Sequence, residues 1–198
     1  MPRAVRRSIW TVAALAAVLA GCSGDEDGEP PSDWREHVSE RRGFRVSVPP
    51  GWHRAERSLS PSLTDPVEIL TVATFPLPGE RGICRSLAAI PPDQALVSVQ
   101  ERGRAARRDP TFPPRPASFE PDPKLPGRST WPYCLRGDVR APIPMLDYWF
   151  GFRDAGRAFH VLVGIGRKTP AEVRRDAFRI LDTLRFDPEV RPGRRSAG

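Results

Sequence analysis

The chain contains several short runs in which apolar and polar residues alternate, the pattern of β-strands with one buried face. The clearest run is at residues 44–48, where Phe and Val residues alternate with Arg45 and Ser47. A second run at 34–39 precedes it, and Gly43 lies in the short connection between them. The two runs therefore predict a β-hairpin near the start of the folded part.

Further strands follow this hairpin. The apolar pattern predicts them at residues 67–75, 95–99, 131–139, 146–153 and 157–166. Strand 67–75 has apolar residues on both alternations, so we expect it to be covered on two sides. Asp154-Ala155-Gly156 separates the last two strands and predicts a tight hairpin.

The final apolar pattern has the period of a helix. One face carries Val173, Ala177, Ile180, Leu181 and Leu184. Thr169 and Glu172 have the spacing of a capping box, and Pro170 stands at the first helical position. The sequence therefore predicts a helix that starts after Thr169 and ends at Arg185.

Residues 109–127 contain seven prolines and cannot form a central strand or a helix. We expect a long loop held to the domain by Phe112 and Phe119. The PxxP spacing at Pro110 and Pro113 also fits a polyproline ligand. The loop interpretation is favoured.

The first residues combine three arginines with an apolar run at 9–20. This run is too short to span a bilayer core of about 30 Å and is typical of a secretory signal. It ends in Leu19-Ala20-Gly21-Cys22, which closely resembles the lipobox of bacterial lipoproteins. The resemblance implies that residues 1–21 are a signal peptide and that the Cys22 thiol carries diacylglycerol. The alternative is an ordinary secretory signal followed by an unmodified cysteine.

The lipobox resemblance also implies an extracytoplasmic protein that is lipid-anchored to the cell membrane through Cys22. Residues 22–32 are acidic, contain two prolines and have little to bury, so we expect a flexible linker. An acidic run at 25–29 lacks the ligand spacing of a calcium loop. A single globular domain is expected at 33–188, followed by a disordered basic tail at 189–198.

Composition changes this picture little. The net charge is +7, and loss of the three leader arginines leaves 7 − 3 = +4. The remaining arginines are spread along the chain, so no nucleic-acid partner is expected. Beyond Cys22 the chain has Cys84 and Cys134. An even pair in an exported protein predicts a disulfide, and two separate buried thiols are the alternative.

Motifs for catalysis and metal binding are absent from the sequence. It contains no Cys-x-x-Cys, no His-Glu-x-x-His and no Gly-x-Ser-x-Gly. We therefore expect no enzyme activity, cofactor or metal. Gly164-Ile165-Gly166 followed by Arg167-Lys168 is a weak candidate for phosphate binding, because it has too few glycines. Of the aromatic residues, Trp52 and Trp149, with His53, are the candidate lining of a ligand crevice, although core packing is the favoured role.

Two segments are similar to the Mog1/PsbP-like superfamily: the string from Gly43 to Trp52 and the closing Ile-Leu-Asp-Thr-Leu-Arg-Phe at 180–186. That resemblance implies an α+β fold, an antiparallel β-sheet flanked by helices on both faces as an α/β/α sandwich. The resemblance also implies a binding or scaffolding role, and the superfamily has no shared catalytic residues. The sequence thus predicts a non-enzymatic binding or scaffolding module of the cell envelope, whose partner is an envelope protein or a small ligand. The alternatives are a small-ligand carrier or sensor with an aromatic crevice, and a hydrolase with an unrecognised site.

Overall fold

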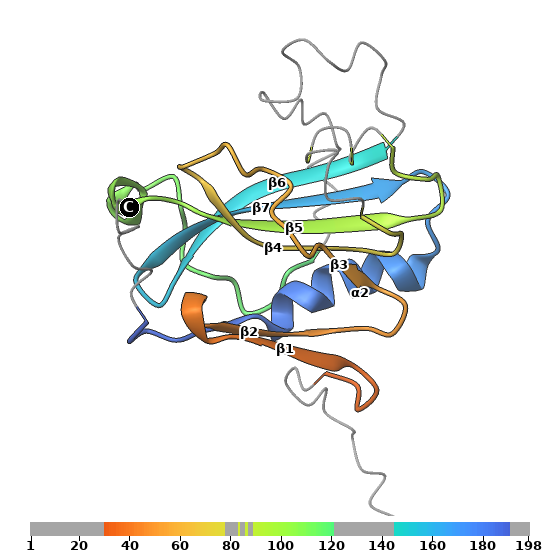
Figure 1. The fold of residues 1–198 in the computed structure, drawn as a ribbon, viewed down its shortest axis with the longest axis horizontal. Coiled ribbons are helices and arrows are strands. Elements are labelled where there is room, and N and C mark those ends of the chain that lie inside the picture. The colour runs from red at the N-terminus through yellow and green to blue at the C-terminus, as the bar shows by residue number, and fades with distance from the viewer. Residues whose placement is uncertain (1–29, 78–82, 84–85, 87–88, 121–144, 191–198) are drawn as a thin grey trace, which may run out of the picture.

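In the computed structural model, the residues described are 30–77, 83, 86, 89–120 and 145–190 (Figure 1). Their elements follow the order β1 (Arg35–Ser39), η1 (Glu40–Arg42), β2 (Phe44–Val48), β3 (His53–Arg54), β4 (Val67–Ala73), β5 (Ala95–Glu101), η2 (Arg104–Arg108), β6 (Met145–Asp154), β7 (Arg157–Gly166), α2 (Ala171–Thr183) and β8 (Arg185–Phe186). Within this part of the chain, the strands form sheet A in the order β1-β2-β8 and sheet B in the order β3-β4-β5-β7-β6.

Both predicted hairpins are confirmed. In sheet A, β1 pairs antiparallel with β2, and Gly43 enters β2 with a φ of 55°, in the left-handed region that favours glycine. In sheet B, Asp154 pairs with Arg157, so the β6–β7 turn consists of Ala155 and Gly156. Both turn residues have positive φ, as the twist of a two-residue hairpin requires.

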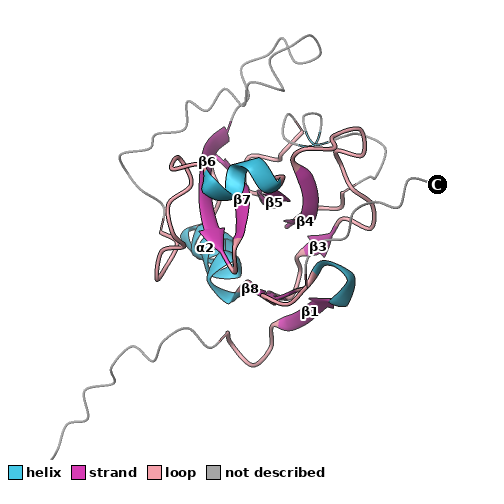
Figure 2. Cartoon of the chain, turned by 90° about the vertical axis from the view of Figure 1, so that its left-hand side faces the viewer, coloured by secondary structure: helices cyan, strands magenta, loops and turns pink. Residues whose placement is uncertain are grey.

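The main core lies between sheet B and a layer made of α2 and sheet A (Figures 1 and 2). The helix packs against β2 on one side and against β5 and β7 on the other. Strand β4 is buried on both faces, as its apolar residues on both alternations predicted. We call the sheet B face that packs against α2 the core face, and the opposite one the far face.

The described chain is therefore α+β, with antiparallel sheets and one fully described α-helix. Helices on both faces of the sheet are not confirmed. On the far face, the part of the chain that can be described supplies loops, η2 and two helical residues, 83 and 86.

The helix differs from its prediction at both ends. Thr169 does not cap it, because its hydroxyl donates instead to the Gln94 carbonyl at 2.8 Å, and Pro170 occupies the N-cap position. The helix ends at Thr183, and Arg185–Phe186 form β8, which pairs with β2. The predicted apolar face is confirmed: Ala177, Ile180, Leu181 and Leu184 are buried, Val173 is half-buried and Phe178 joins them.

The start of the proline-rich loop is described as far as residue 120, and both predicted anchors are buried. Phe112 and Phe119 are 4% and 6% exposed. Between them Pro114 forms a parallel bridge to Arg153 on β6. The prediction of a loop held by its two phenylalanines is confirmed for this portion.

Several predictions fall outside the described residues. They concern the leader at 1–21, the lipidation site Cys22, most of the linker, the pair Cys84 and Cys134, the strand at 131–139 and the tail from residue 191.

Candidate functional site

Three polar side chains lie side by side across the far face of sheet B. Glu68 on β4 pairs with Gln100 on β5, and Gln100 pairs with His160 on β7. Cross-strand partners project to the same side of a sheet, so these residues form one lateral line, which we call the polar row. Glu68 and Gln100 are only 6% and 4% exposed and His160 is half-buried, so two of the three polar side chains are buried.

A β-bulge explains how Glu68 comes to face this side. The register of β4 shifts between Glu68 and Leu70, which places Glu68 and Thr71 on one face although three positions separate them. The Thr71 hydroxyl donates to Glu68 Oε1 at 2.6 Å, and Ser58 donates to Oε2 at 3.0 Å. The Thr71 hydroxyl has one hydrogen and donates it to Glu68. Ser98 is therefore the donor in the 2.9 Å hydrogen bond between the Ser98 and Thr71 hydroxyls.

Gln100 is the residue of the polar row whose hydrogen bonding is incomplete. Its Nε2 is buried and has no hydrogen-bond partner within the described chain. An unpaired buried amide of this kind costs about 1–3 kcal/mol. Among the described residues, the Gln100 amide is therefore the donor of the polar row that is left for a further acceptor.

Aromatic rings enclose His160 at the end of the row. Phe112 stacks on it at 4.8 Å between ring centroids, and Trp149 meets it edge-on at 5.2 Å. Gly151 makes room for this stack, because a Cβ there would lie 2.8 Å from the Phe112 ring. Burial, with a smaller effect from the positive charge of Arg102, lowers the pKa of His160 to about 4. The imidazole is therefore neutral at pH 7.

This arrangement suits binding better than catalysis. A neutral imidazole, a free amide donor and a carboxylate lie in line between apolar clusters. The hydroxyl of Ser98 donates to Thr71 and so is not activated by an imidazole. Groups of this kind can orient a small molecule with hydrogen-bonding groups, in the manner of ligand sites with few polar contacts.

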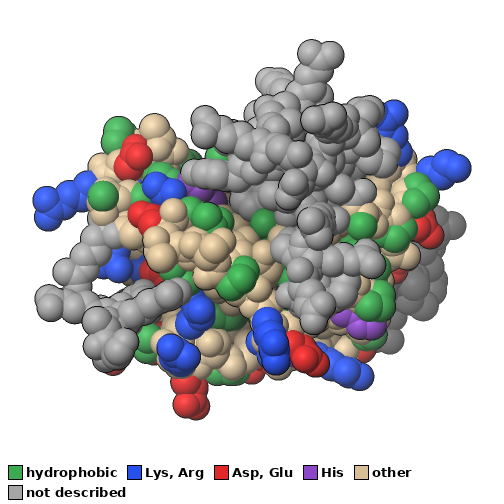
Figure 3. Space-filling view, turned by 45° about the horizontal axis from the view of Figure 1, so that its top comes forward, with side chains coloured by type: hydrophobic (Ala, Val, Ile, Leu, Met, Phe, Trp, Pro, Cys, Tyr) green, Lys and Arg blue, Asp and Glu red, His purple; other side chains and the backbone are tan. Residues whose placement is uncertain are grey.

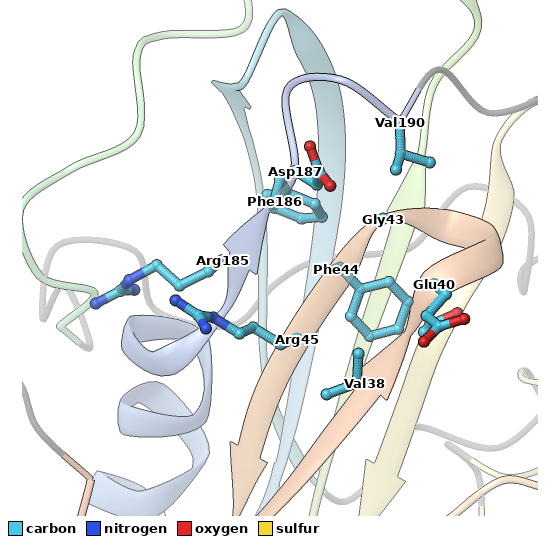
Figure 4. A pocket seen from close by; sticks show the side chains of 10 residues that line it. Val38, Glu40, Gly43, Phe44, Arg45, Arg185, Phe186, Asp187 and Val190 are labelled. Atoms are coloured by element: carbon cyan, nitrogen blue, oxygen red, sulfur yellow. The ribbon is translucent and has the colours of Figure 1, made fainter.

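A second candidate surface is a pocket of about 410 Å³ at the end of sheet A (Figure 4). Its lining includes Phe44, Phe186, Arg45, Arg185 and Val38. The last three residues form a second lateral line, because Val38 pairs with Arg45 and Arg45 pairs with Arg185. All three are exposed, so this line lies on the outward face of sheet A.

The predicted crevice residues do not come together. Trp52 packs against the main core, on the side of α2, whereas Trp149 packs against the second cluster on the far face. His53 is exposed on β3. The correction follows from strand alternation: Trp149 points away from its neighbours Tyr148 and Phe150, which face the main core, and lies against His160 instead.

The weak phosphate candidate at 164–168 is occupied by the protein itself. The Gly166 amide donates to Gln94, and the Lys168 amide donates to Pro92 at 2.6 Å. Gly166 is packed so closely that a Cβ would lie 2.3 Å from the Pro92 carbonyl oxygen. These amides are therefore not free to hold an anion.

Sequence reasoning missed the polar row because its members are scattered as single polar residues in different strands. Alternation could have shown that Gln100 and His160 oppose the apolar positions of their strands, but only the register brings them together. Glu68 was hidden further by the bulge.

The described residues contain no group of three or more His, Cys, Asp or Glu that could hold a metal ion. They also contain no helix with the length and apolarity needed to cross a membrane. On the face in Figure 3, basic and acidic side chains are interspersed. Comparison with models of protein families, with curated proteins and with solved structures finds no match for this chain.

Proposed function

We propose that this protein is a bacterial lipoprotein: a binding or scaffolding module without enzyme activity, held outside the cytoplasm by a lipid on Cys22. The observation that carries the proposal is the sequence Leu19-Ala20-Gly21-Cys22 at the end of a short apolar run. Two acyl chains hold a protein stably at a membrane, because each buried CH₂ contributes about 0.8 kcal/mol.

The described body suits such a tether. Its first strand begins at Arg35, so the residues from Cys22 onward can serve as a spacer. Residues 31–34 form a turn, in which the Trp34 amide donates to Pro31, and at about 3.3 Å per extended residue the nine residues 22–30 reach at most about 30 Å from the anchor. This reach lets the folded body touch the membrane or stand clear of it.

The finer fold proposal is a Mog1/PsbP-like domain. The two segments that carry the resemblance lie side by side, since β8 pairs with β2 through Phe44 and Phe186. Thr183 extends the contact, because its hydroxyl accepts from the Ser47 amide at 3.0 Å and lies 3.1 Å from the Ser47 carbonyl oxygen. The contact between these two segments, one from each end of the domain, supports the proposal that the chain has the architecture of this superfamily.

The anchor is tested with Cys22→Ser and, as its control, Cys84→Ser in the native host. We expect the native and control proteins to incorporate labelled palmitate and to sediment with membranes. Cys22→Ser should remain an unprocessed precursor or appear in the medium. Membrane retention and an unchanged mass for Cys22→Ser would refute the lipid anchor.

The polar row supports a second candidate function, a carrier or sensor of a small polar molecule. Its specific support is the buried Nε2 of Gln100, which has no partner among the described residues, beside the neutral imidazole of His160. Native mass spectrometry of protein purified gently from its own cells tests this function. We expect the native protein and Gln94→Met to carry a small-molecule adduct and Gln100→Met to lack it. A native protein with no adduct would contradict this function.

A further inference from the structure

Two arginines lie side by side on the outward face of sheet A, and the charge of Arg185 acts on the carboxyl group of Asp182. Arg45 and Arg185 stand directly opposite each other on β2 and β8, and like charges in this position destabilise a sheet. Within the part of the chain that is described, neither side chain forms an ion pair. Arg185 donates only to the carbonyl oxygens of Asp182 and Leu184.

The acids of the same pocket do not neutralise the pair. Glu40 and Asp187 both line it, but Figure 4 shows the two arginine side chains extending to one side of Phe44 and Glu40 lying on the other. Asp187 accepts a hydrogen bond from the Glu189 amide at 2.8 Å. The Arg45 guanidinium is therefore open to an external anion, and Arg185, which donates to those carbonyl oxygens through Nη1, keeps Nε and Nη2 for it.

Two further features lie beside the arginines. Val38, next in the lateral line, is 63% exposed and is the only large hydrophobic side chain so exposed among the described residues. Val190 also lines the pocket, and the sequence continues from it with Arg191, Arg194 and Arg195. Among the described residues, this end of sheet A thus combines an exposed apolar side chain with two adjacent exposed arginines.

We infer that this surface, formed by Val38, Arg45 and Arg185, docks on the anionic phospholipid headgroups of the membrane that carries the anchor. Each guanidinium fork matches phosphate oxygens in a bidentate manner. Val38 meets the boundary between headgroups and acyl chains, where a single apolar side chain is accommodated. The spacer of nine residues, 22–30, is long enough to let this end of sheet A reach the bilayer. The inference rests on the proposed anchor and deepens it.

The test uses the chain from residue 22 with Cys22→Ser, so that no acyl chain contributes to binding. All the hydrogen bonds and packing described above lie within residues 30–190, so this chain keeps the whole described body. Sedimentation with vesicles of phosphatidylcholine alone, or of phosphatidylcholine with phosphatidylglycerol, measures the affinity. We expect binding to the anionic vesicles only, weakened by added salt.

The decisive variant is Arg45→Gln with Arg185→Gln. It should bind the anionic vesicles about 30-fold more weakly, the equivalent of about 1 kcal/mol for each arginine near the surface. Arg57→Gln with Arg175→Gln removes the same charge from two exposed arginines elsewhere and should lose much less affinity. Val38→Ser, with both arginines intact, should also weaken binding. Thermal melts of each variant confirm that the fold is kept.

Three results would overturn the inference: equal losses in the two double variants, tight binding to neutral vesicles, or displacement from the vesicles by inorganic phosphate at constant ionic strength. Displacement would assign the arginine pair to a soluble anion. Because the tested chain carries no lipid, none of these results bears on acylation of Cys22, which the palmitate experiment decides separately.

Discussion

At the scale of single residues, Arg157 at the start of β7 is a buried charged residue whose guanidinium has several hydrogen-bond partners. Its Nε and Nη2 donate to the two carboxylate oxygens of Glu101 at 3.0 and 2.8 Å, and its Nη1 donates to the Gly43 carbonyl at 3.2 Å. The guanidinium also lies 4.9 Å from the centre of the Phe186 ring. One side chain therefore joins sheet B to the start of β2 and to β8.

Glu101→Gln tests this pair. It leaves the Arg157 charge buried without its counter-charge, so we expect a loss of about 3–5 kcal/mol in the free energy of unfolding, measured with urea. Glu101→Leu combined with Arg157→Met removes both charges and should recover most of that loss. A single variant as stable as the native protein would show that the pair is not buried as described.

His160 gives a pH-dependent prediction. Its ordinary pKa of 6.5 falls to about 4 in the folded chain, so between these values the unfolded chain binds more protons. Stability should therefore fall as the pH drops from 6.5 to 4. Arg102, Asp65 and Asp109 are the charged groups that act on the imidazole, and the acids oppose the shift. His160→Gln has no such proton, so its urea stability should fall less between pH 7 and pH 4.5.

The matched control for this prediction is His53→Gln, because that side chain is exposed. It should show the native pH dependence. Burial raises the pKa of Asp176 and Asp182, but both carboxyl groups are present in every protein compared. Equal pH dependence in native protein and His160→Gln would contradict a buried neutral imidazole.

At the scale of elements, α2 depends on a residue from a distant loop. Its last turn contains no basic side chain. Arg115 of the proline-rich loop supplies one, donating to the carbonyl oxygens of Leu181 at 2.7 Å, of Asp182 at 3.1 Å and of Leu184. The same guanidinium pairs with Asp154 at 3.0 Å. A cation at this end of a helix also interacts favourably with the helix dipole.

Arg115→Met keeps the apolar stem and removes this contact. We expect a loss of about 2–3 kcal/mol in the free energy of unfolding, because charged hydrogen bonds to carbonyl groups are lost at a half-buried site. Residues 109–120 should also become more sensitive to limited proteolysis. Arg108→Met, at an exposed position of η2, is the control and should change neither measurement.

Elements with a strong period were predictable, and elements defined by distant partners were not. The β1–β2 hairpin and the apolar face of α2 followed from local alternation and from the helical repeat. Strand β8 is only two residues long, and it exists because β2, far away in the sequence, pairs with it. Thr169 carried a capping signal, yet the Gln94 carbonyl competed successfully for its hydroxyl. Local signals cannot reveal such competition.

At the scale of the whole molecule, the two candidate surfaces lie on opposite sides. The polar row is on the far face of sheet B, and the arginine pair is on the outward face of sheet A, with α2 between the sheets (Figure 1). A domain that docks on a membrane through sheet A would therefore turn the polar row away from the bilayer. The two proposals are compatible, because neither surface blocks the other.

The predicted disulfide concerns the covering of the far face. Cys84 and Cys134 lie outside the described residues, but Ile83, next to Cys84, is buried in the cluster on that face. A bond between them would close a loop of about 50 residues that contains β5, η2 and the Phe112 and Phe119 anchors. In the chain-entropy account, such a closure adds at most about 4 kcal/mol to stability.

The test uses the Cys22→Ser chain, which leaves these two cysteines as the only thiols. Alkylation of the unfolded, unreduced protein should modify neither cysteine, and alkylation after reduction should modify both. Reduction should lower the stability measured with urea, because the unfolded chain gains conformational freedom when the loop is no longer closed. In the folded protein, residues 84–134 should become the first segment that a protease cuts. Two reactive thiols in the untreated protein would show instead that packing, such as that of Phe112 on His160, holds this covering without a covalent link.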